Sequence, residues 1–326
     1  MHRFKIGFWG KLNQVLILVL SKPILSMKLA INNPAGSLTN RPSSITALLC
    51  LFLTSLPATA QTIEVKLPTG ITATANFHDG NPSQAAVLLV HGFHQTHHSQ
   101  PMSSLAANLA SKGYTTLSPT ITLGVNKRSQ SMACEAVHTQ TMKQDVAEID
   151  YWVNWLGKKE YKKIVLIGFS STGNVEILSY NAQGSHPAIK KAILVSMNPI
   201  LTDNSERQRT HSQIDAKQHA DEKNPRIFSV GYCKNNFTAT ANTYLSYAQY
   251  DASRILELIR QTPVSTELIF GSADTILPAT WLAQIKTLKT RAQVTIIDEA
   301  NHFFDDTSEF DLAEEIENTL KNIPAQ

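Results

Sequence analysis

The chain has 326 residues and carries 29 Lys and Arg against 26 Asp and Glu, a net charge of +3. Six of the basic residues and none of the acidic ones fall in residues 1–60, so the rest of the chain has 23 basic residues and a net charge of −3. This balance gives no basis for nucleic-acid binding, and we expect none. The 266 residues from 61 to 326 have the length of one α/β domain with an insertion.

Residues 1–60 have the pattern of a secretory signal peptide. An apolar run, Thr46–Leu56, precedes Ala58-Thr59-Ala60, which resembles a cleavage site before Gln61. The run is shorter than the roughly 20 apolar residues that a membrane span needs. We therefore expect export to the periplasm or beyond after cleavage near Ala60, and a mature chain without a membrane span. We expect translation to start at Met27, with residues 1–26 as an upstream extension, and a retained N-terminal anchor is the alternative.

The first half of the mature chain predicts a hairpin and then alternating strands and helices. Thr62–Leu67 and Ile71–Phe77 alternate apolar and polar residues, as in an antiparallel hairpin at a sheet edge. Ala85–Val90 is a continuous apolar run, typical of a strand buried on both faces. The pattern then predicts a helix over Pro101–Lys112 and a strand over Tyr114–Leu117. The next helix follows from apolar residues at helical spacing, namely Met142, Val146, Ile149, Val153 and Leu156.

The second half repeats this alternation. Apolar runs predict buried strands at Ile164–Ile167, Ala192–Val195, Glu267–Phe270 and Val294–Ile297. Predicted helices cover Asn174–Tyr180, Ile255–Ile259, Trp281–Leu288 and Phe310–Leu320. Strands that alternate with helices predict an α/β fold with a doubly wound, mostly parallel sheet. In such sheets, ligands bind at the carboxyl ends of the strands.

Four distinctive sequences fall at these strand ends: His91-Gly92-Phe93, Gly168-Phe169-Ser170-Ser171-Thr172-Gly173, Gly271-Ser272-Ala273-Asp274 and Asn301-His302-Phe303. The second has the pattern of a nucleophile elbow, in which a tight turn between strand and helix exposes a serine. A serine hydroxyl needs an imidazole to accept its proton, and the imidazole needs a carboxylate to orient it. The order Ser170, Asp274, His302 supplies these three groups.

With these motifs, residues 61–326 resemble the α/β-hydrolase superfamily, in particular its serine esterases and lipases. The resemblance implies Ser170 as the nucleophile, His302 as general base and then acid, and Asp274 as its orienting partner. The backbone N–H groups of Phe93 and Ser171 would form the oxyanion hole. The resemblance also implies an acyl-serine intermediate and a small acyl substrate, without metal or organic cofactor. It places a cap insertion at about residues 200–262.

Several assignments within the site stay open. The elbow has Thr172 where the superfamily usually has glycine, and Ser171 is an alternative nucleophile. Asp203 is an alternative acid. The histidines His94, His97 and His98 are expected at a pocket rim or in solvent rather than around a metal. Four aromatic residues of the insertion either line a substrate channel or pack the insertion onto the core: Phe237, Tyr244, Tyr247 and Tyr250.

The mature chain keeps two cysteines, Cys134 and Cys233, and an exported protein with two cysteines is expected to form a disulfide. The alternative is two buried free thiols.

The sequence as a whole predicts an exported serine hydrolase acting on carboxylic esters or thioesters. Cleavage of amides or peptides, or perhydrolysis, by the same triad is one alternative. A non-catalytic binding protein built on a hydrolase scaffold is another.

Overall fold

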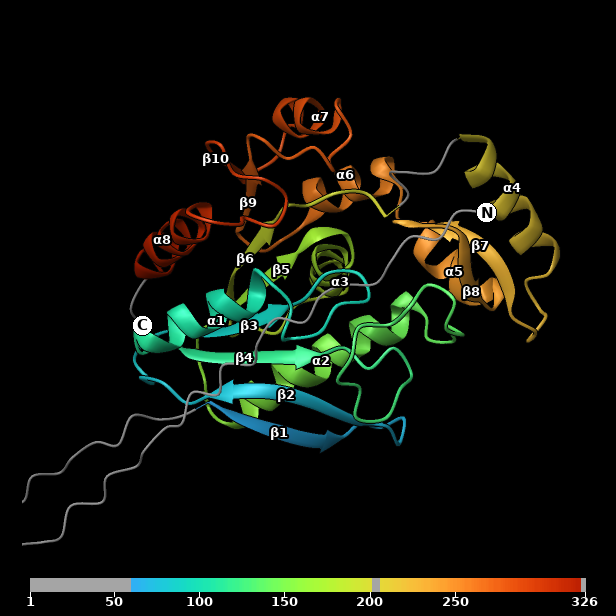
Figure 1. Ribbon diagram of the computed structural model, residues 1–326. Helices are drawn as coiled ribbons and strands as arrows, with labels where there is room; N and C mark the ends of the chain where they lie inside the picture. The colour runs from blue at the N-terminus through green and yellow to red at the C-terminus, as the bar shows by residue number, and fades with distance from the viewer. Residues whose placement is uncertain (1–59, 201–205, 324–326) are drawn as a thin grey trace, which may run out of the picture. The chain divides into compact units, whose positions relative to one another are not determined.

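The computed structural model describes residues 60–200 and 206–323. Its centre is an eight-stranded sheet, which runs in Figure 1 from β1 at the lower edge to β10 near the top. The order across the sheet is β1 (Gln61–Lys66), β2 (Thr72–His78), β4 (Thr115–Thr120), β3 (Ala86–Val90), β5 (Ile164–Phe169), β6 (Ile189–Val195), β9 (Thr266–Gly271) and β10 (Gln293–Ile297). The pairs β1–β2 and β2–β4 are antiparallel, and every other pair is parallel.

Helices cover both faces of this sheet, which explains the unbroken apolar strands. Alternate residues of β3 point to opposite sides, Leu88 into one core layer and Leu89 into the other. One layer lies under α1 (Met102–Ser111) and α8 (Ser308–Lys321). The other lies under α2 (Met142–Lys158), α3 (Ser170–Ala182), α6 (Ala252–Gln261) and α7 (Trp281–Thr287). The predicted doubly wound, mostly parallel sheet is confirmed.

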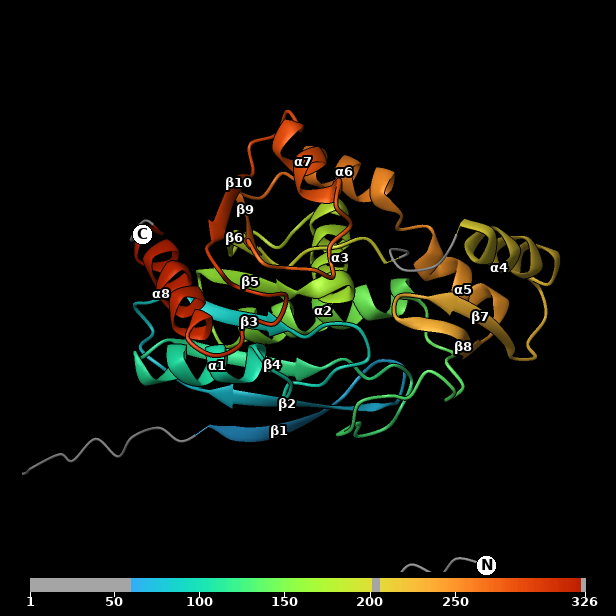
Figure 2. The ribbon, with the colours of Figure 1, turned by 45° about the horizontal axis from the view of Figure 1, so that its top comes forward.

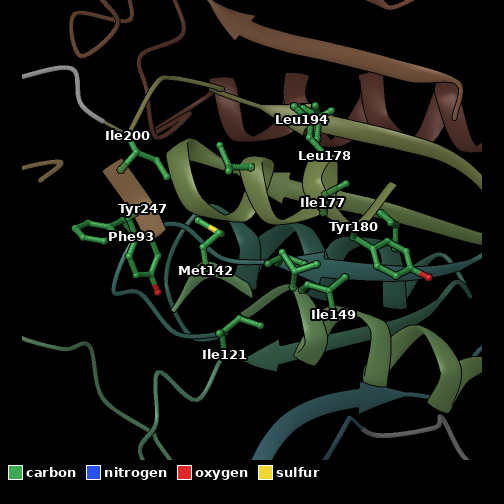
Figure 3. Packing of buried hydrophobic residues seen from close by; sticks show 14 of the residues in the cluster. Phe93, Ile121, Met142, Ile149, Ile177, Leu178, Tyr180, Leu194, Ile200 and Tyr247 are labelled. Atoms are coloured by element: carbon green, nitrogen blue, oxygen red, sulfur yellow. The ribbon is translucent and has the colours of Figure 1, made fainter. Parts of the chain in front are cut away.

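The helix that follows the elbow is buried on nearly all sides. Its residues from Ser171 to Asn181 are all buried, as expected for a helix packed between the sheet and other helices. Figure 3 shows side chains of α2, α3 and β6 gathered in one layer, among them Ile149, Leu178 and Leu194. This packing fixes the position of the helix N-terminus, where Ser170 lies.

The chain reverses its direction across the sheet between β3 and β5. From β3 it goes through α1 to β4 on one side, then returns through α2 to β5 on the other side. The crevice at such a switch point, beyond the carboxyl ends of the strands, is the usual ligand site of α/β sheets. Both the loop after Val90 and the elbow at Ser170 lie there.

An insertion lies between β6 and α6, on the right of Figure 2. Its described elements are α4 (Glu206–Gln218), the antiparallel hairpin β7 (Arg226–Val230) and β8 (Cys233–Ala239), and α5 (Ala241–Ala248). The sequence predicts an insertion at about residues 200–262, but it does not predict the hairpin. The reason is that β8 is polar and carries a Lys and two Asn, which are depleted in strands. The predicted leader, residues 1–60, lies outside the described residues except for Ala60.

Within the two described ranges, no helix combines the length and the apolar character needed to cross a membrane.

Candidate active site

The turn between β5 and α3 holds Ser170 in a strained conformation. Its φ is +58°, in the left-handed region that side-chain-bearing residues rarely adopt. The turn is tight because two glycines allow a close approach of the backbone. A Cβ on Gly173 would lie 2.6 Å from the carbonyl oxygen of His91, and a Cβ on Gly168 would lie 2.8 Å from the carbonyl oxygen of Gly173. The elbow geometry therefore depends on small residues on both sides of Ser170, although Thr172 carries a side chain.

Replacing Gly173 with alanine is expected to destabilise the fold by about 3 kcal/mol, because the added methyl group meets backbone atoms that cannot move aside. The measurement is the free energy of unfolding from urea titration. Gly157→Ala in α2 is the matched control, because its Cβ would meet only the movable imidazole of His186, at 3.3 Å. Alanine there should be neutral or stabilising by up to about 1 kcal/mol. Equal losses in both variants would contradict the role given to Gly173.

Three side chains predicted to act together meet at the carboxyl end of the sheet. Ser170 Oγ lies 2.9 Å from Nε2 of His302. Nδ1 of His302 lies 2.7 Å from Oδ2 of Asp274. The side chains of His302 and Asp274 are only 4% and 1% exposed, so solvent does not compete for this contact. The carboxylate fixes the proton on Nδ1, which leaves Nε2 free to accept the proton of Ser170.

Backbone groups hold the Asp274 carboxylate in place. Its Oδ1 accepts hydrogen bonds from the N–H groups of Ile276 at 2.9 Å and Leu277 at 3.2 Å. The turn that carries Asp274 packs directly against the loop that carries His302. Gly271, which begins this turn, lies so close to the loop that a Cβ on it would fall 2.1 Å from the carbonyl oxygen of Ala300. Both oxygens of Asp274 are therefore occupied and the carboxylate cannot turn away from His302.

The predicted oxyanion-hole residues, Phe93 and Ser171, both line a pocket of about 350 Å³ above Ser170. The N–H of Ser171 belongs to the first turn of α3, where no intrahelical acceptor exists. The N–H of Phe93 donates to none of the described residues. Two free N–H groups beside a serine hydroxyl, at a helix N-terminus, favour negative charge at this position.

The loop that carries Phe93 is tied down by His91 and Arg128. Nε2 of His91 accepts the N–H of Ile121 at 3.0 Å, so its proton is on Nδ1, 2.9 Å from the carbonyl oxygen of Gly92. Burial, together with the nearby charge of Arg128, lowers the pKa of His91 to about 3, so the ring is neutral. Arg128 donates to the carbonyl oxygens of His94 and Gln95. These contacts fix the backbone on either side of Phe93.

Arg128 is itself buried and lies near acidic side chains of α2 and α3. Burial lowers its pKa to about 10, and the nearby carboxylates Glu148, Asp145 and Glu176 oppose that change. Burial also raises the pKa of Asp145 to about 7, against the effect of its hydrogen bonds to Tyr247 and Gln140. The buried guanidinium of Arg128 thus faces several buried carboxyl groups next to the loop that carries Phe93.

The alternatives left open by the sequence have different outcomes. The hydroxyl of Ser170, and not that of Ser171, contacts His302. Asp203 lies outside the described residues. The expected position at a pocket rim or in solvent is wrong for His94 and His97, which are both buried. His94 stacks on His138 with ring centres 4.4 Å apart, whereas His97 bonds to Thr120 and its ring centre lies 3.9 Å from that of His98.

None of the four aromatic residues of the insertion is among the described residues that line the pocket beside Ser170, although the rings of Phe237 and Tyr247 lie 6.2 and 6.4 Å from the ring of Phe93. Tyr244 stacks on Phe228, Tyr247 donates to Asp145, and Phe237 stacks on His138. Tyr250 packs against the core in part. Among the described residues, these contacts favour the packing interpretation over the channel.

The predicted disulfide between Cys134 and Cys233 is present. It joins the loop after β4 to the start of β8. Ligand atoms of His94 lie within 4.8 Å of both sulfurs, but metal ions bind thiolates, and these sulfurs are bonded to each other.

Several residues near Ser170 were not found by sequence reasoning. Asn198 approaches the hydroxyl of Ser170 at 3.3 Å. Asn174 donates to the carbonyl oxygens of Ser170 and Val195. Ser196 donates to the carbonyl oxygen of His302 at 2.7 Å. The sequence around these residues gives no local pattern that would indicate these tertiary contacts.

No protein-family model matches the sequence, and no curated protein matches it either. Solved structures do match the fold. The α/β hydrolase GrgF from Penicillium sp. sh18 is 15% identical, with a TM-score of 0.63 over 82% of this chain and 100% of that one. Est1E from Butyrivibrio proteoclasticus, with ferulic acid bound, is 16% identical, with a TM-score of 0.58 over 81% and 100%. The thioesterase domain from the curacin biosynthetic pathway is 16% identical, with a TM-score of 0.53 over 81% and 100%.

These matches show that the chain has the α/β-hydrolase fold. The resemblance seen in the sequence is confirmed at the level of the fold.

Proposed function

We propose that this protein is an exported serine hydrolase that cleaves carboxylic esters or thioesters through an acyl intermediate on Ser170. The observation that carries the proposal is the continuous chain of contacts from Ser170 Oγ through His302 to Asp274, with Ser170 held in a strained elbow. The esterases and the thioesterase among the structures of the same fold support this reaction class. The leader sequence and the disulfide support export.

In the first half of the reaction, Nε2 of His302 accepts the proton of Ser170 as Oγ attacks the carbonyl carbon. The carbonyl oxygen becomes an oxyanion and accepts hydrogen bonds from the N–H groups of Phe93 and Ser171. Asp274 stabilises the imidazolium that forms at the same moment. His302 then gives its proton to the leaving alcohol or thiol, and the acyl group remains on Ser170.

In the second half, a water molecule takes the place of the leaving group. His302 accepts one of its protons, and the hydroxide adds to the acyl carbon. The same two N–H groups stabilise the second oxyanion. Collapse releases the acid and returns the proton to Ser170.

The test is labelling of the purified protein with a fluorophosphonate, which reacts with activated serines, followed by hydrolysis of ethyl acetate in a pH-indicator assay. We expect labelling and turnover. A folded protein that neither reacts with the probe nor hydrolyses the ester would contradict the proposal and favour a binding protein on a hydrolase scaffold.

Asn198 is expected to assist the nucleophile. The hydroxyl of Ser170 has one proton, which it donates to His302 in the reactive arrangement. The side-chain amide of Asn198 can then bond to Oγ only by donating from its NH₂ group, so we expect this group to face Oγ. Asn198→Ala should lower kcat by about tenfold to a hundredfold with little change in KM, the cost of a hydrogen bond to a group that gains charge. Asn198→Asp should lower kcat further, since a carboxylate cannot donate a hydrogen bond to Oγ of Ser170. A rise in KM at constant kcat in both variants would show that Asn198 only binds substrate.

A further inference from the structure

The pocket above Ser170 is mostly apolar, and none of the described residues that line it is a Lys, Arg, Asp or Glu. Beyond Ser170, Ser171 and His302, the polar side chains of this lining are the amides of Gln95 and Asn198 and the phenol of Tyr232. Its volume, about 350 Å³, is near the small end for ligand pockets. A substrate that carries a carboxylate or an ammonium group would lose its hydration here without gaining a partner.

The geometry of the reaction divides the pocket into two sides. His302 protonates the leaving group, so the leaving group lies on the side of His302, where Phe303 and Ile276 line the pocket. The oxyanion points toward the N–H groups of Phe93 and Ser171. The acyl group takes the remaining direction, toward Gly231 and Tyr232 in the turn of the β7–β8 hairpin.

Two aromatic side chains, Phe93 and Tyr232, form a wall on this acyl side. The rings of Phe93 and Tyr232 meet edge to face, with centres 5.5 Å apart. Gly231 lies against the Phe93 ring, and a Cβ there would come within 3.2 Å of two ring carbons. The ring of Phe93 can approach the hairpin this closely because residue 231 has no side chain. Tyr232 lines the pocket and is 56% exposed, so part of this residue is accessible to a ligand.

The wall is held in place by contacts on both sides of Tyr232. The N–H of Gly231 donates to the carbonyl oxygen of Ile200 at 2.9 Å. The next residue, Cys233, is bonded to Cys134 in the loop after β4. The hydroxyl of Tyr232 lies 3.4 Å from Nδ1 of His94. A side chain fixed at its own position and at both neighbours presents a preformed surface to the substrate.

We propose that the acyl half of the substrate is an uncharged aromatic group that packs against Phe93 and Tyr232. Aromatic rings prefer edge-to-face and offset stacked contacts with other rings, and this preference adds to the burial of apolar area. The proposal rests on the proposed function. It concerns the acyl group alone and leaves the reaction class unchanged.

The experiment compares ethyl esters, so that the leaving group stays constant, using protein purified after expression of the full chain. Ethyl 3-phenylpropanoate and ethyl 3-cyclohexylpropanoate form the central pair, because they match in chain length and differ in aromaticity. We expect kcat/KM to be about fivefold higher for the phenyl ester. Monoethyl succinate should be slower than the phenyl ester by about a hundredfold, because its carboxylate must be desolvated. Ethyl octanoate should also be slower than the phenyl ester.

Variants of Tyr232 test whether the preference for the phenyl ester arises from contacts with the Tyr232 ring. In Tyr232→Ala the phenyl-to-cyclohexyl ratio of kcat/KM should fall to about one, whereas Tyr232→Phe keeps the ring and should keep the ratio. Phe310→Ala is the matched control, since Phe310 is a 70% exposed aromatic residue on α8 and outside the pocket lining. Circular dichroism of each variant checks that it is folded.

Failure of this proposal can be told apart from failure of the proposed function. A protein that reacts with the fluorophosphonate and hydrolyses ethyl acetate, but prefers octanoate or succinate or treats the central pair equally, overturns the aromatic acyl group alone. An unchanged ratio in Tyr232→Ala overturns it as well. A protein that neither reacts with the probe nor hydrolyses any ester of the panel overturns both.

Discussion

Ser170→Ala is expected to lower kcat/KM for ester hydrolysis by about 10⁴-fold or more, because it removes the nucleophile and leaves only binding and oxyanion stabilisation. In the structure, Oγ of Ser170 is the serine oxygen within hydrogen-bonding distance of Nε2 of His302, at 2.9 Å. Labelling by the fluorophosphonate should disappear completely in this variant. The two readouts together separate loss of the nucleophile from loss of substrate binding.

The neighbouring serine supplies a stringent control. Ser171→Ala keeps the backbone N–H that the oxyanion needs and removes only a buried hydroxyl that does not contact His302. This variant should still react with the probe, and its kcat/KM should stay within about tenfold of the unmodified protein. The reverse result, with labelling lost in Ser171→Ala and retained in Ser170→Ala, would make Ser171 the nucleophile.

Loss of the disulfide should have the largest effect on stability. The cysteines are 99 residues apart, and a cross-link that closes a loop of this length restricts the unfolded chain by about 4–5 kcal/mol in the chain-entropy treatment. The double variant Cys134→Ala, Cys233→Ala should lose about this free energy of unfolding. Cys233 is completely buried and Cys134 is nearly so, which is why alanine is preferred to serine here.

Urea unfolding with and without dithiothreitol measures this effect. The unmodified protein should lose stability when the reductant is present, whereas the double variant should unfold at the same urea concentration in both conditions. Hydrogen exchange should show faster exchange in β7 and β8 than in the central sheet after reduction, since the bond attaches the hairpin. If the reduced and oxidised proteins unfold at the same urea concentration, the disulfide does not stabilise the fold.

The central sheet could be predicted because each of its strands is recognisable without knowledge of its neighbours. A run such as Ile164–Ile167 must be buried on both faces, and the turn after it carries a distinctive residue. Ser170, Asp274 and His302 each follow a predicted strand, so the sequence alone predicts that these three residues lie at the carboxyl end of the sheet. The predicted elements agree with the structure for this reason, with ends that differ by a few residues.

Residues that act through tertiary contacts were beyond sequence reasoning. Arg128 appears in the sequence as one charge in a polar loop, yet it binds the carbonyl oxygens beside Phe93. Asn198 follows β6 with nothing to mark it, and its role depends on its 3.3 Å approach to Ser170. Tyr232 is not predicted as a pocket residue, whereas Tyr244 and Tyr247 are candidates for a substrate channel. The reason is that a tyrosine in a hairpin turn has the same local sequence pattern whether it faces a pocket or solvent.

The attachment of the β7–β8 hairpin has a consequence for the evolution of substrate range. The groups proposed to carry out the chemistry sit on loops of the central sheet, whereas Gly231 and Tyr232 sit in the turn of a separate two-stranded sheet. The disulfide and backbone hydrogen bonds attach this sheet to the loop after β4. Changes between Arg226 and Ala239 are therefore expected to reshape the proposed acyl side without altering the loops that carry Ser170, His302 and Asp274. Hairpins of other length or composition, grafted between these two positions with Cys233 retained, offer a direct route to enzymes of altered selectivity.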